Sequence, residues 1–238
     1  MPSPIQVLHE DDTCLILNKP AGLAVQGGAG VSQSLDSLLA RMYSPRPLLV
    51  HRLDRDTSGV ILVAKGKASA AHFSRLMGEG SLCEKKYLAV CAGKPGRVSG
   101  EIRLEMEVHG KNKHCETRFT VLRSGPFPAP CLEAYPQLSS YGNVFSLMEL
   151  EPGTGRMHQL RRHMALTHTP ILGDDKYGDF PLNKALGKSL KLKQLLLHAH
   201  RLRISVGQGI PPLDIRAPLP PYFLAFLEFV GLREEIIE

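Results

Sequence analysis

The chain has 238 residues, of which 43% are hydrophobic and 22% are charged. This composition is normal for a globular protein, and the length suits one large domain or two small ones with a substantial core. The formal net charge of +6 favours an anionic partner, nucleic acid first, although solubility alone is the other explanation of such a charge.

The membrane and secreted classes are not favoured. No uninterrupted apolar run approaches membrane-spanning length, and the N-terminus lacks the basic stretch and apolar core of a signal peptide. The cysteines form no C-x-x-C pair and are odd in number, which predicts reduced thiols in a cytoplasmic protein. These cysteines are Cys14, Cys83, Cys91, Cys115 and Cys131.

Two strands are the first elements expected along the chain. Residues 5–8 and 14–17 are short apolar segments joined by an acidic turn, and NKPAG at residues 18–22 suits a tight turn after the second strand. The glycine-rich segment 26–30 is too weak a pattern to predict a phosphate site by itself.

Helical spacing of apolar residues predicts a helix near residues 35–42, with Ser32 or Ser34 as its N-terminal cap. Residues 68–77 predict a second helix, and residues 85–92 predict a strand.

The clearest strand pattern lies at residues 102–108, where apolar and charged side chains alternate with a period of two. Residues 109–114 are predicted to form a basic loop, followed by a returning strand at 116–122. Three prolines between 126 and 130 predict an irregular connection, and residues 144–150 predict a further strand.

The last third of the chain begins with a predicted helix at residues 156–167, whose apolar stripe is Met157, Leu160 and Met164. A strand and a helix then close the chain, at residues 195–204 and 221–230. We therefore predict one α+β domain over residues 1–238, with a central, largely antiparallel mixed sheet flanked by helices and loops.

The stretch at residues 50–65, VHRLDRDTSGVILVAK, joins a charge-dense loop to a short apolar segment. Residues 60–64 predict a buried strand, so the loop is held rigidly at one end. Such a loop is a good position for a carboxylate that must point at a substrate. An ordinary surface loop with two Asp–Arg pairs is the open alternative.

Three side chains of different chemistry stand at the edges of predicted elements: the carboxylate Asp54, the phenol Tyr87 and the guanidinium Arg161. Their spacing along the sequence does not show that they meet. From the residues alone, Tyr87 is more often a half-buried strand tyrosine and Arg161 more often a surface helix arginine.

HRLDRDTSGVILVAK at residues 51–65 resembles the motif of the RluA-type family of pseudouridine synthases. KKYLAV at 85–90 resembles the second motif of this family, and GTGRMHQLRRHM at 153–164 resembles the third. Four further similar segments follow the same order: LNKPAGLAV at 17–25, KHCETRF at 113–119, PILGDDKYGD at 170–179 and LLLHAHRL at 195–202. The glycine-rich loop and the DDKYGD segment favour members that act on large-subunit ribosomal RNA.

The resemblance implies a pseudouridine synthase catalytic fold with its active site in a basic cleft. It also implies isomerisation of uridines in RNA to pseudouridine without a metal or an organic cofactor. Asp54 corresponds to the essential aspartate, Tyr87 to the tyrosine of the second motif, and Arg161 to the basic partner of the aspartate. The chain departs from the pattern in two respects. Met157 stands where Thr, Ser or Tyr is frequent. Many relatives also carry a small N-terminal RNA-binding domain, and the resemblance implies that this sequence begins at the catalytic part, as a shorter form or as a fragment.

The RNA contacts are expected on either side of the catalytic residues. The target uridine must leave the helical stack, and Arg52 and Leu53 are candidates to fill or brace the gap. Arg156, Lys111 and Lys113 are candidate phosphate contacts, with solvated surface charge as the open alternative for each.

Two other functions compete with an RNA pseudouridine synthase as explanations of the sequence. The first is a metal-dependent hydrolase that combines Asp54 with histidines, namely His158, His163, His198 and His200. However, His158 and His163 lie five residues apart, whereas two histidines that bind one metal from the same helix face lie at i and i+4. The second is a non-catalytic RNA-binding protein, which explains the basic charge but not the carboxylate in its loop. We therefore expect a monomeric enzyme without membrane contact, acting on ribosomal RNA, with transfer RNA as the second candidate.

Overall fold

The computed structural model describes residues 5–28, 30–78, 82–108, 110–205 and 212–232. Contacts divide the chain into two compact units. The first comprises Met1–Lys86 and His198–Pro218, and the second Tyr87–Leu197 and Leu219–Glu238. A single domain over residues 1–238 stays a prediction.

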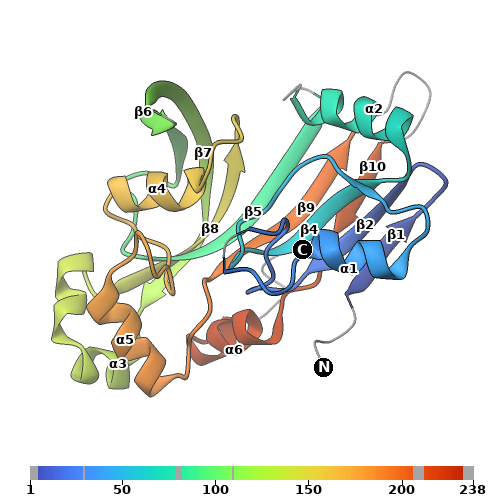
Figure 1. Ribbon diagram of the computed structural model, residues 1–238. Helices are drawn as coiled ribbons and strands as arrows, with labels where there is room; N and C mark the ends of the chain where they lie inside the picture. Colours follow the sequence, from blue (N-terminus) through green and yellow to red (C-terminus); the bar gives the residue numbers. More distant parts are fainter. Residues whose placement is uncertain (1–4, 29, 79–81, 109, 206–211, 233–238) are drawn as a thin grey trace. The chain divides into compact units, whose positions relative to one another are not determined.

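The first unit is built on a mixed sheet (Figure 1). Its strands are β1 (Gln6–Glu10), β2 (Cys14–Lys19), β3 (Leu48–Leu49), β4 (Ser58–Ala64), β9 (Leu197–Ile204) and β10 (Leu213–Arg216). β1 pairs with β2, β2 and β3 pair with β4, and β10 pairs with β9, all antiparallel. β4 and β9 are parallel, with Ser58 opposite His198. The predicted sheet type, mixed and largely antiparallel, is confirmed.

Strand β4 is the central strand of this unit, and all of its residues are buried. The prediction of a buried strand after the charged loop is therefore confirmed. Gly59 allows β4 to approach β9, because a Cβ on this residue would lie 2.2 Å from the backbone oxygen of Ala199. Its φ of +111° also lies in a region that glycine adopts without strain.

Two helices cover the first unit's core. At the start of α1 (Leu35–Met42), the Ser34 hydroxyl accepts from the amide of Ser37 at 3.2 Å, and the Ser37 hydroxyl accepts from the amide of Ser34 at 3.0 Å. This reciprocal capping box selects Ser34 from the two predicted caps. Helix α2 (Lys67–Gly78) places Phe73 and Leu76 in the same apolar cluster as side chains of β2 and β4.

The second unit contains an antiparallel run of strands in the order β5-β8-β7-β6. These strands are β5 (Cys83–Ala92), β6 (Ser99–Val108), β7 (Lys111–Pro126) and β8 (Val144–Pro152). The helices are α3 (Ala129–Ala134), the 3-10 helix η1 (Pro136–Tyr141), α4 (Gln159–Leu166), α5 (Phe180–Ser189) and α6 (Pro221–Phe229).

Both faces of β5 are covered, because alternate residues of this strand point to opposite sides. Leu88 and Val90 of β5 belong to an apolar cluster that includes side chains of α5 and α6. Ala89 belongs to the other cluster, together with Leu160 and Met164 of α4. Helix α4 is thereby packed against one face of β5.

Three predictions for this unit are wrong. Lys111 and Lys113 lie on β7 rather than in a loop, because β6 and β7 form one hairpin in which Val108 opposes Lys111. The proline-rich connection contains α3, since prolines are tolerated in the first turn of a helix. Met157 does not belong to the apolar stripe of α4. The helix begins at Gln159, and Met157 is 53% exposed.

All five cysteines are buried and free of disulfide bonds, as predicted. Within the described ranges, none of the helices is both long enough and apolar enough to cross a membrane.

Candidate active site

A buried lysine at the end of β2 holds the loop that precedes β4 in place. The ammonium group of Lys19 donates hydrogen bonds to the carbonyl oxygens of Pro20 at 2.9 Å, Leu23 at 2.8 Å and Arg55 at 2.9 Å. The side chain of Lys19 is fully buried. One of these bonds therefore fixes the backbone one residue after Asp54.

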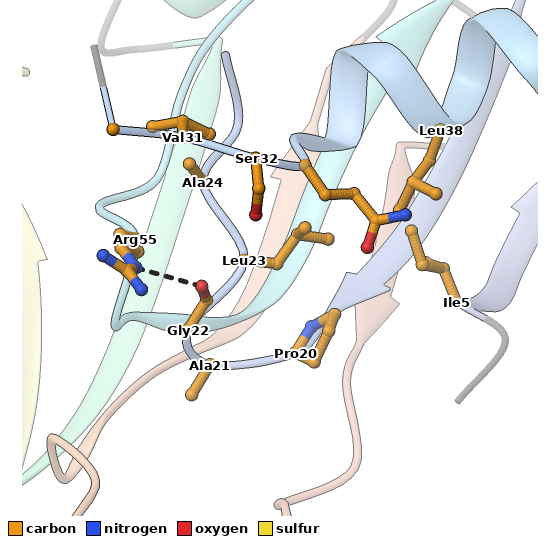
Figure 2. A pocket seen from close by; sticks show the side chains of 12 residues that line it. Ile5, Pro20, Ala21, Gly22, Leu23, Ala24, Val31, Ser32, Leu38 and Arg55 are labelled. Atoms are coloured by element: carbon orange, nitrogen blue, oxygen red, sulfur yellow. Dashed lines mark hydrogen bonds between the residues drawn. The ribbon is translucent and has the colours of Figure 1, made fainter. Parts of the chain in front are cut away.

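The NKPAG turn and the loop also bind each other directly. The amide of Gly22 donates to the carbonyl of Arg55 at 2.9 Å, and Nε of Arg55 donates to the carbonyl of Gly22 at 3.1 Å, the bond dashed in Figure 2. The amide of Thr57 closes the loop by donating to the carbonyl of Asp54 at 3.2 Å. The backbone around Asp54 is thus held more firmly than in an ordinary surface loop.

The charge of Lys19 also acts on this loop. Burial lowers the pKa of Lys19 to about 7, while the charges of Asp56 and Asp54 oppose that shift. Three carbonyl acceptors and two nearby carboxylates complement an ammonium group. The loop therefore provides partners for the buried ammonium group of Lys19.

His51, at the start of the charged motif, braces the loop against β4. Its Nε2 accepts a hydrogen bond from the amide of Leu62 at 2.9 Å, so Nδ1 carries the proton. Burial, with a smaller contribution from Lys85, lowers the pKa of His51 to about 3. The ring is consequently neutral near pH 7, and its role is structural.

A second buried histidine joins β4 to β9. Nδ1 of His198 lies 2.9 Å from the hydroxyl of Ser58, and Nε2 lies 3.3 Å from the carbonyl of Ala217. Nε2 must donate to this carbonyl, so Nδ1 accepts from the serine in the neutral ring. Burial lowers the pKa of His198 to about 4, although the bond to Ala217 opposes the shift.

This histidine predicts an acid-sensitive fold. The unfolded chain binds a proton on His198 near the ordinary pKa of 6.5, whereas the folded chain binds it only near pH 4. The free energy of unfolding should therefore fall as the pH drops from 6.5 to 4, by on the order of 2 kcal/mol for this ring. Chemical denaturation across that range measures the loss. His198→Gln should make the dependence shallower, although His51 still contributes to it, and an unchanged slope in that variant would contradict the assignment.

A cavity of about 420 Å³ adjoins the loop within the first unit. Figure 2 shows its lining: Arg55 stands on the loop side, and Leu23 and Leu38 belong to the apolar part of the wall. The NKPAG turn contributes Pro20, Ala21 and Gly22, and residues 30–33 form most of the remainder. The cavity therefore offers apolar surface and one guanidinium beside the residue that follows Asp54.

In the second unit, Arg161 of α4 forms a two-pronged ion pair with Asp174. Nε donates to Oδ2 at 2.8 Å and Nη2 donates to Oδ1 at 2.6 Å, and both residues are nearly fully buried. The interpretation of Arg161 as an exposed helix residue is therefore wrong. A buried arginine needs such a partner, because an unpaired charge inside a protein is costly.

Two aromatic side chains of the second unit have distinct surroundings. Tyr87 is half-buried on β5, opposite Leu150 of β8, and packs against the cluster beneath α4. Tyr177 lies with its hydroxyl 3.0 Å from Nδ1 of His158, whose backbone is left-handed with φ +53°. The imidazole of His158 is engaged by this tyrosine just ahead of α4.

The predicted RNA contacts are mostly exposed. Arg52, Arg156, Lys111 and Lys113 are exposed, as expected for phosphate contacts, whereas Leu53 is only 6% exposed. Burial of Leu53 favours bracing the loop over filling a gap in an RNA stack.

One group of residues in the described part of the chain has the donor atoms for a metal ion. His9, Asp11 and Cys14 bring one atom each within 4.8 Å of one another. Oδ1 of Asp11 accepts hydrogen bonds from the amides of Thr13 at 2.7 Å and Cys14 at 2.8 Å. The carboxylate therefore shapes the turn between β1 and β2.

Comparison with known proteins identifies the family. Residues 13–166, more than half of the chain, match the family described as RNA pseudouridylate synthase. The chain belongs to this family.

Relatives of this pseudouridylate synthase carry the name ribosomal large subunit pseudouridine synthase C. The protein of Rickettsia bellii is 38% identical over 219 residues, which cover 91% of this chain and 69% of the relative. The protein of Rickettsia felis is 39% identical over 219 residues, covering 91% and 68%. The protein of Vibrio vulnificus is 34% identical over 224 residues, covering 90% and 65%.

Solved structures of synthase relatives agree with the fold. Human RNA Pseudouridylate Synthase Domain Containing 4 matches with a TM-score of 0.75 and 25% identity, over 95% of this chain and 93% of that one. Human RNA Pseudouridylate Synthase Domain Containing 1 matches with a TM-score of 0.69 and 25% identity, over 91% and 84%. The predicted synthase fold is confirmed.

In this pseudouridylate synthase, Asp54 belongs to the first unit, whereas Tyr87 and Arg161 belong to the second. Within the second unit, α4 and β5 position the latter two. No role was predicted for Lys19 or Asp174 from the sequence. Both residues lie in segments that resemble the family, NKPAG and DDKYGD. This resemblance was the sequence feature that could have drawn attention to them.

Proposed function

We propose that this pseudouridylate synthase isomerises specific uridines of large-subunit ribosomal RNA to pseudouridine, with Asp54 as the essential carboxylate. The observation that supports it best is the setting of Asp54. The residue lies within the family match, in a loop clamped by Lys19. The names of the relatives support ribosomal RNA as the substrate. A monomer acting in the cytoplasm is part of the same proposal.

The reaction rearranges atoms within one nucleotide. The bond between N1 of uracil and C1′ of ribose breaks, the base turns, and C5 bonds to C1′. The proton lost from C5 is balanced by one gained at N1, so no co-reactant is consumed. A carboxylate can attack the ring or the anomeric carbon, or assist departure of the uracil anion, and each role needs ionised Asp54.

The two residues of the second unit have complementary roles in this proposal. A guanidinium can hold a carboxylate ionised and oriented, and we assign this role toward Asp54 to Arg161, whose two-pronged pair is formed with Asp174. Tyr87 presents a ring on which a base can stack and a hydroxyl that can move a proton. Both roles come from the resemblance of their motifs and from their positions on α4 and β5.

The target uridine must first leave the RNA stack, at a cost of a few kcal/mol. Arg52 is exposed and can replace part of the lost stacking or contact phosphate, whereas buried Leu53 supports the backbone next to Asp54. We therefore assign substrate contact to Arg52 and bracing to Leu53.

Tyr87→Phe should lose most turnover and keep RNA affinity, because the ring still stacks but the hydroxyl is absent. Loss of a proton-transfer group typically costs about 100-fold or more in rate. Single-turnover kinetics at saturating RNA measures the effect. If the variant keeps the wild-type rate, Tyr87 is only a packing residue of β5.

Lys111→Ala and Lys113→Ala should weaken binding to any RNA by a similar factor and leave the saturated rate intact. Each lost phosphate contact should reduce the slope of log affinity against log salt by roughly 0.7–0.9. Arg156→Ala is expected to weaken RNA binding and reduce the salt slope in the same way. Lys188 is exposed on α5 and serves as the control. An unchanged slope in the two lysine variants would show that these charges face solvent only.

Tritium at C5 of uridine provides a direct assay, because formation of the C5–C1′ bond releases that hydrogen. The purified chain should release tritium from a large-subunit ribosomal RNA transcript, with transfer RNA transcripts as the second arm. RNA binding without release from any substrate would instead favour a non-catalytic RNA-binding protein.

A further inference from the structure

The segment PILGDDKYGD contains the carboxylate that holds Arg161. Asp174 receives Nε of Arg161 at 2.8 Å and Nη2 at 2.6 Å. Arg161 is 3% exposed and Asp174 is 1% exposed, so water does not compete for this pair. Two parallel bonds between planar groups fix direction as well as distance.

The backbone of the turn also holds Asp174. Its Oδ1 accepts from the amides of Lys176 at 2.9 Å and Tyr177 at 3.0 Å, in addition to Arg161. Burial raises the pKa of Asp174, but the hydrogen bonds from Arg161 and the two amides outweigh burial, and the pKa lies below its ordinary value. The carboxylate is therefore ionised and cannot rotate without losing several partners.

The turn is anchored to α5 on both sides of Asp174. Oδ1 of Asn183 accepts from the amide of Gly173 at 2.8 Å, and Nδ2 of Asn183 donates to the carbonyl of Asp174 at 2.8 Å. A Cβ at Gly173 would lie 2.0 Å from the carbonyl oxygen of Gln194, and its φ is +75°. Asn183 therefore anchors the backbone on both sides of Asp174, and a side chain at Gly173 would not fit.

The remaining surroundings of the guanidinium leave it one orientation. The ring of Tyr177 lies 5.4 Å from Cζ of Arg161, a stacking distance for a cation on an aromatic face. Asp175, which is largely exposed, lies 3.2 Å from Nη2. The edge formed by Nε and Nη2 faces Asp174, so the edge that carries Nη1 points away from it.

We propose that Asp174 is a positioning residue for the reaction: it fixes Arg161 so that the Nη1 edge of the guanidinium meets the reacting groups. This inference rests on the proposed function, in which Arg161 assists the reacting carboxylate. Asp174 acts only through Arg161 and does not touch the substrate.

Asp179 is the matched control in the same segment. It accepts from the amide of Leu182 at 2.8 Å at the start of α5 and from the hydroxyl of Tyr141 at 2.9 Å. These bonds stabilise the fold, and none of them involves Arg161. Asp179→Asn should therefore lower the melting temperature and keep the single-turnover rate.

Asp174→Asn should slow the single-turnover rate at saturating RNA by about 100-fold, because misplacing a reacting group by an ångström has effects of that size. RNA affinity should stay within about twofold, since the phosphate contacts are elsewhere. In the Arg161→Met background, Asp174→Asn should cause no further loss of rate. A wild-type rate in Asp174→Asn, or an additive loss in the double variant, would overturn the proposal.

Asp174→Glu covers the case in which the Asn variant does not fold at the assay temperature. It keeps the charge and moves the carboxylate by one methylene. A slowed rate in the folded Glu variant supports positioning, and an unchanged rate contradicts it.

Hydrogen exchange of the Arg161 Nε proton, followed by NMR, does not depend on activity. Slow exchange in the wild type that becomes fast in Asp174→Asn, but not in Asp179→Asn, supports the fixed orientation. Equal exchange rates in the wild type, Asp174→Asn and Asp179→Asn overturn the fixed orientation of Arg161. If the wild type forms no pseudouridine, the proposed function fails, and the exchange result alone decides whether Asp174 holds Arg161.

Discussion

Asp54→Asn is expected to abolish pseudouridine formation and to leave the fold and the RNA affinity intact. The amide keeps the shape of the side chain but has no negative charge with which to attack or to assist departure of the base. The clamp from Lys19 acts on backbone carbonyls, so the loop does not depend on the carboxylate of Asp54 for its path. Single-turnover conversion, RNA binding and thermal melting together measure these outcomes.

Asp56→Asn is the control for this experiment. Asp56 lies in the same loop, and its charge acts on Lys19 as that of Asp54 does. The control variant should remain active, because only Asp54 occupies the position of the essential aspartate. Measurable turnover by Asp54→Asn protein, free of wild-type contamination, would contradict the proposed role.

Arg161→Ala should have the second-largest effect, and it should act on both the rate and the stability. The substitution leaves Asp174 buried without its partner, which typically costs about 3–5 kcal/mol in the free energy of unfolding. The chemical step should also slow, because Asp54 loses the proposed guanidinium. Arg161→Lys should be slow as well, since an ammonium group cannot form the planar two-pronged pair.

Saturated rates and a salt series separate this role from simple RNA binding. If Arg161→Ala changes only the affinity and its salt dependence, Arg161 is a phosphate contact, and the proposed pairing with Asp54 must be abandoned. Denaturation of the same protein measures the cost of leaving Asp174 unpaired.

Local patterns predicted those parts of the fold that depend on local physics. The apolar run at Val60 to Ala64 predicted β4, because a short β-branched segment suits a strand covered on both sides. Alternation at 102–108 predicted β6, and Ser34 was one of two expected caps. Helix α5 and strand β10 were not predicted. Strand β10 is a four-residue strand, and its pairing with β9 is tertiary information.

The site could be predicted only in part, for the same reason. Motif resemblance selected Asp54, Tyr87 and Arg161, but the burial of a helical arginine depends on a carboxylate that lies 13 positions further along the chain. The sequence does not distinguish Lys19 from any other lysine at the end of a strand, because its three carbonyl acceptors are brought to it by the folded loops. Met157 fitted a helical period by number, yet α4 begins after it.

Mapping of pseudouridine in ribosomal RNA is the most direct test of uridine isomerisation by Asp54. Cells that lack this protein should lose pseudouridine at specific positions of large-subunit ribosomal RNA. Wild-type protein should restore those positions, and Asp54→Asn protein expressed at the same level should not. Restoration by the Asn variant would contradict the role of Asp54, and an unchanged map in cells without the protein would contradict the proposed substrate.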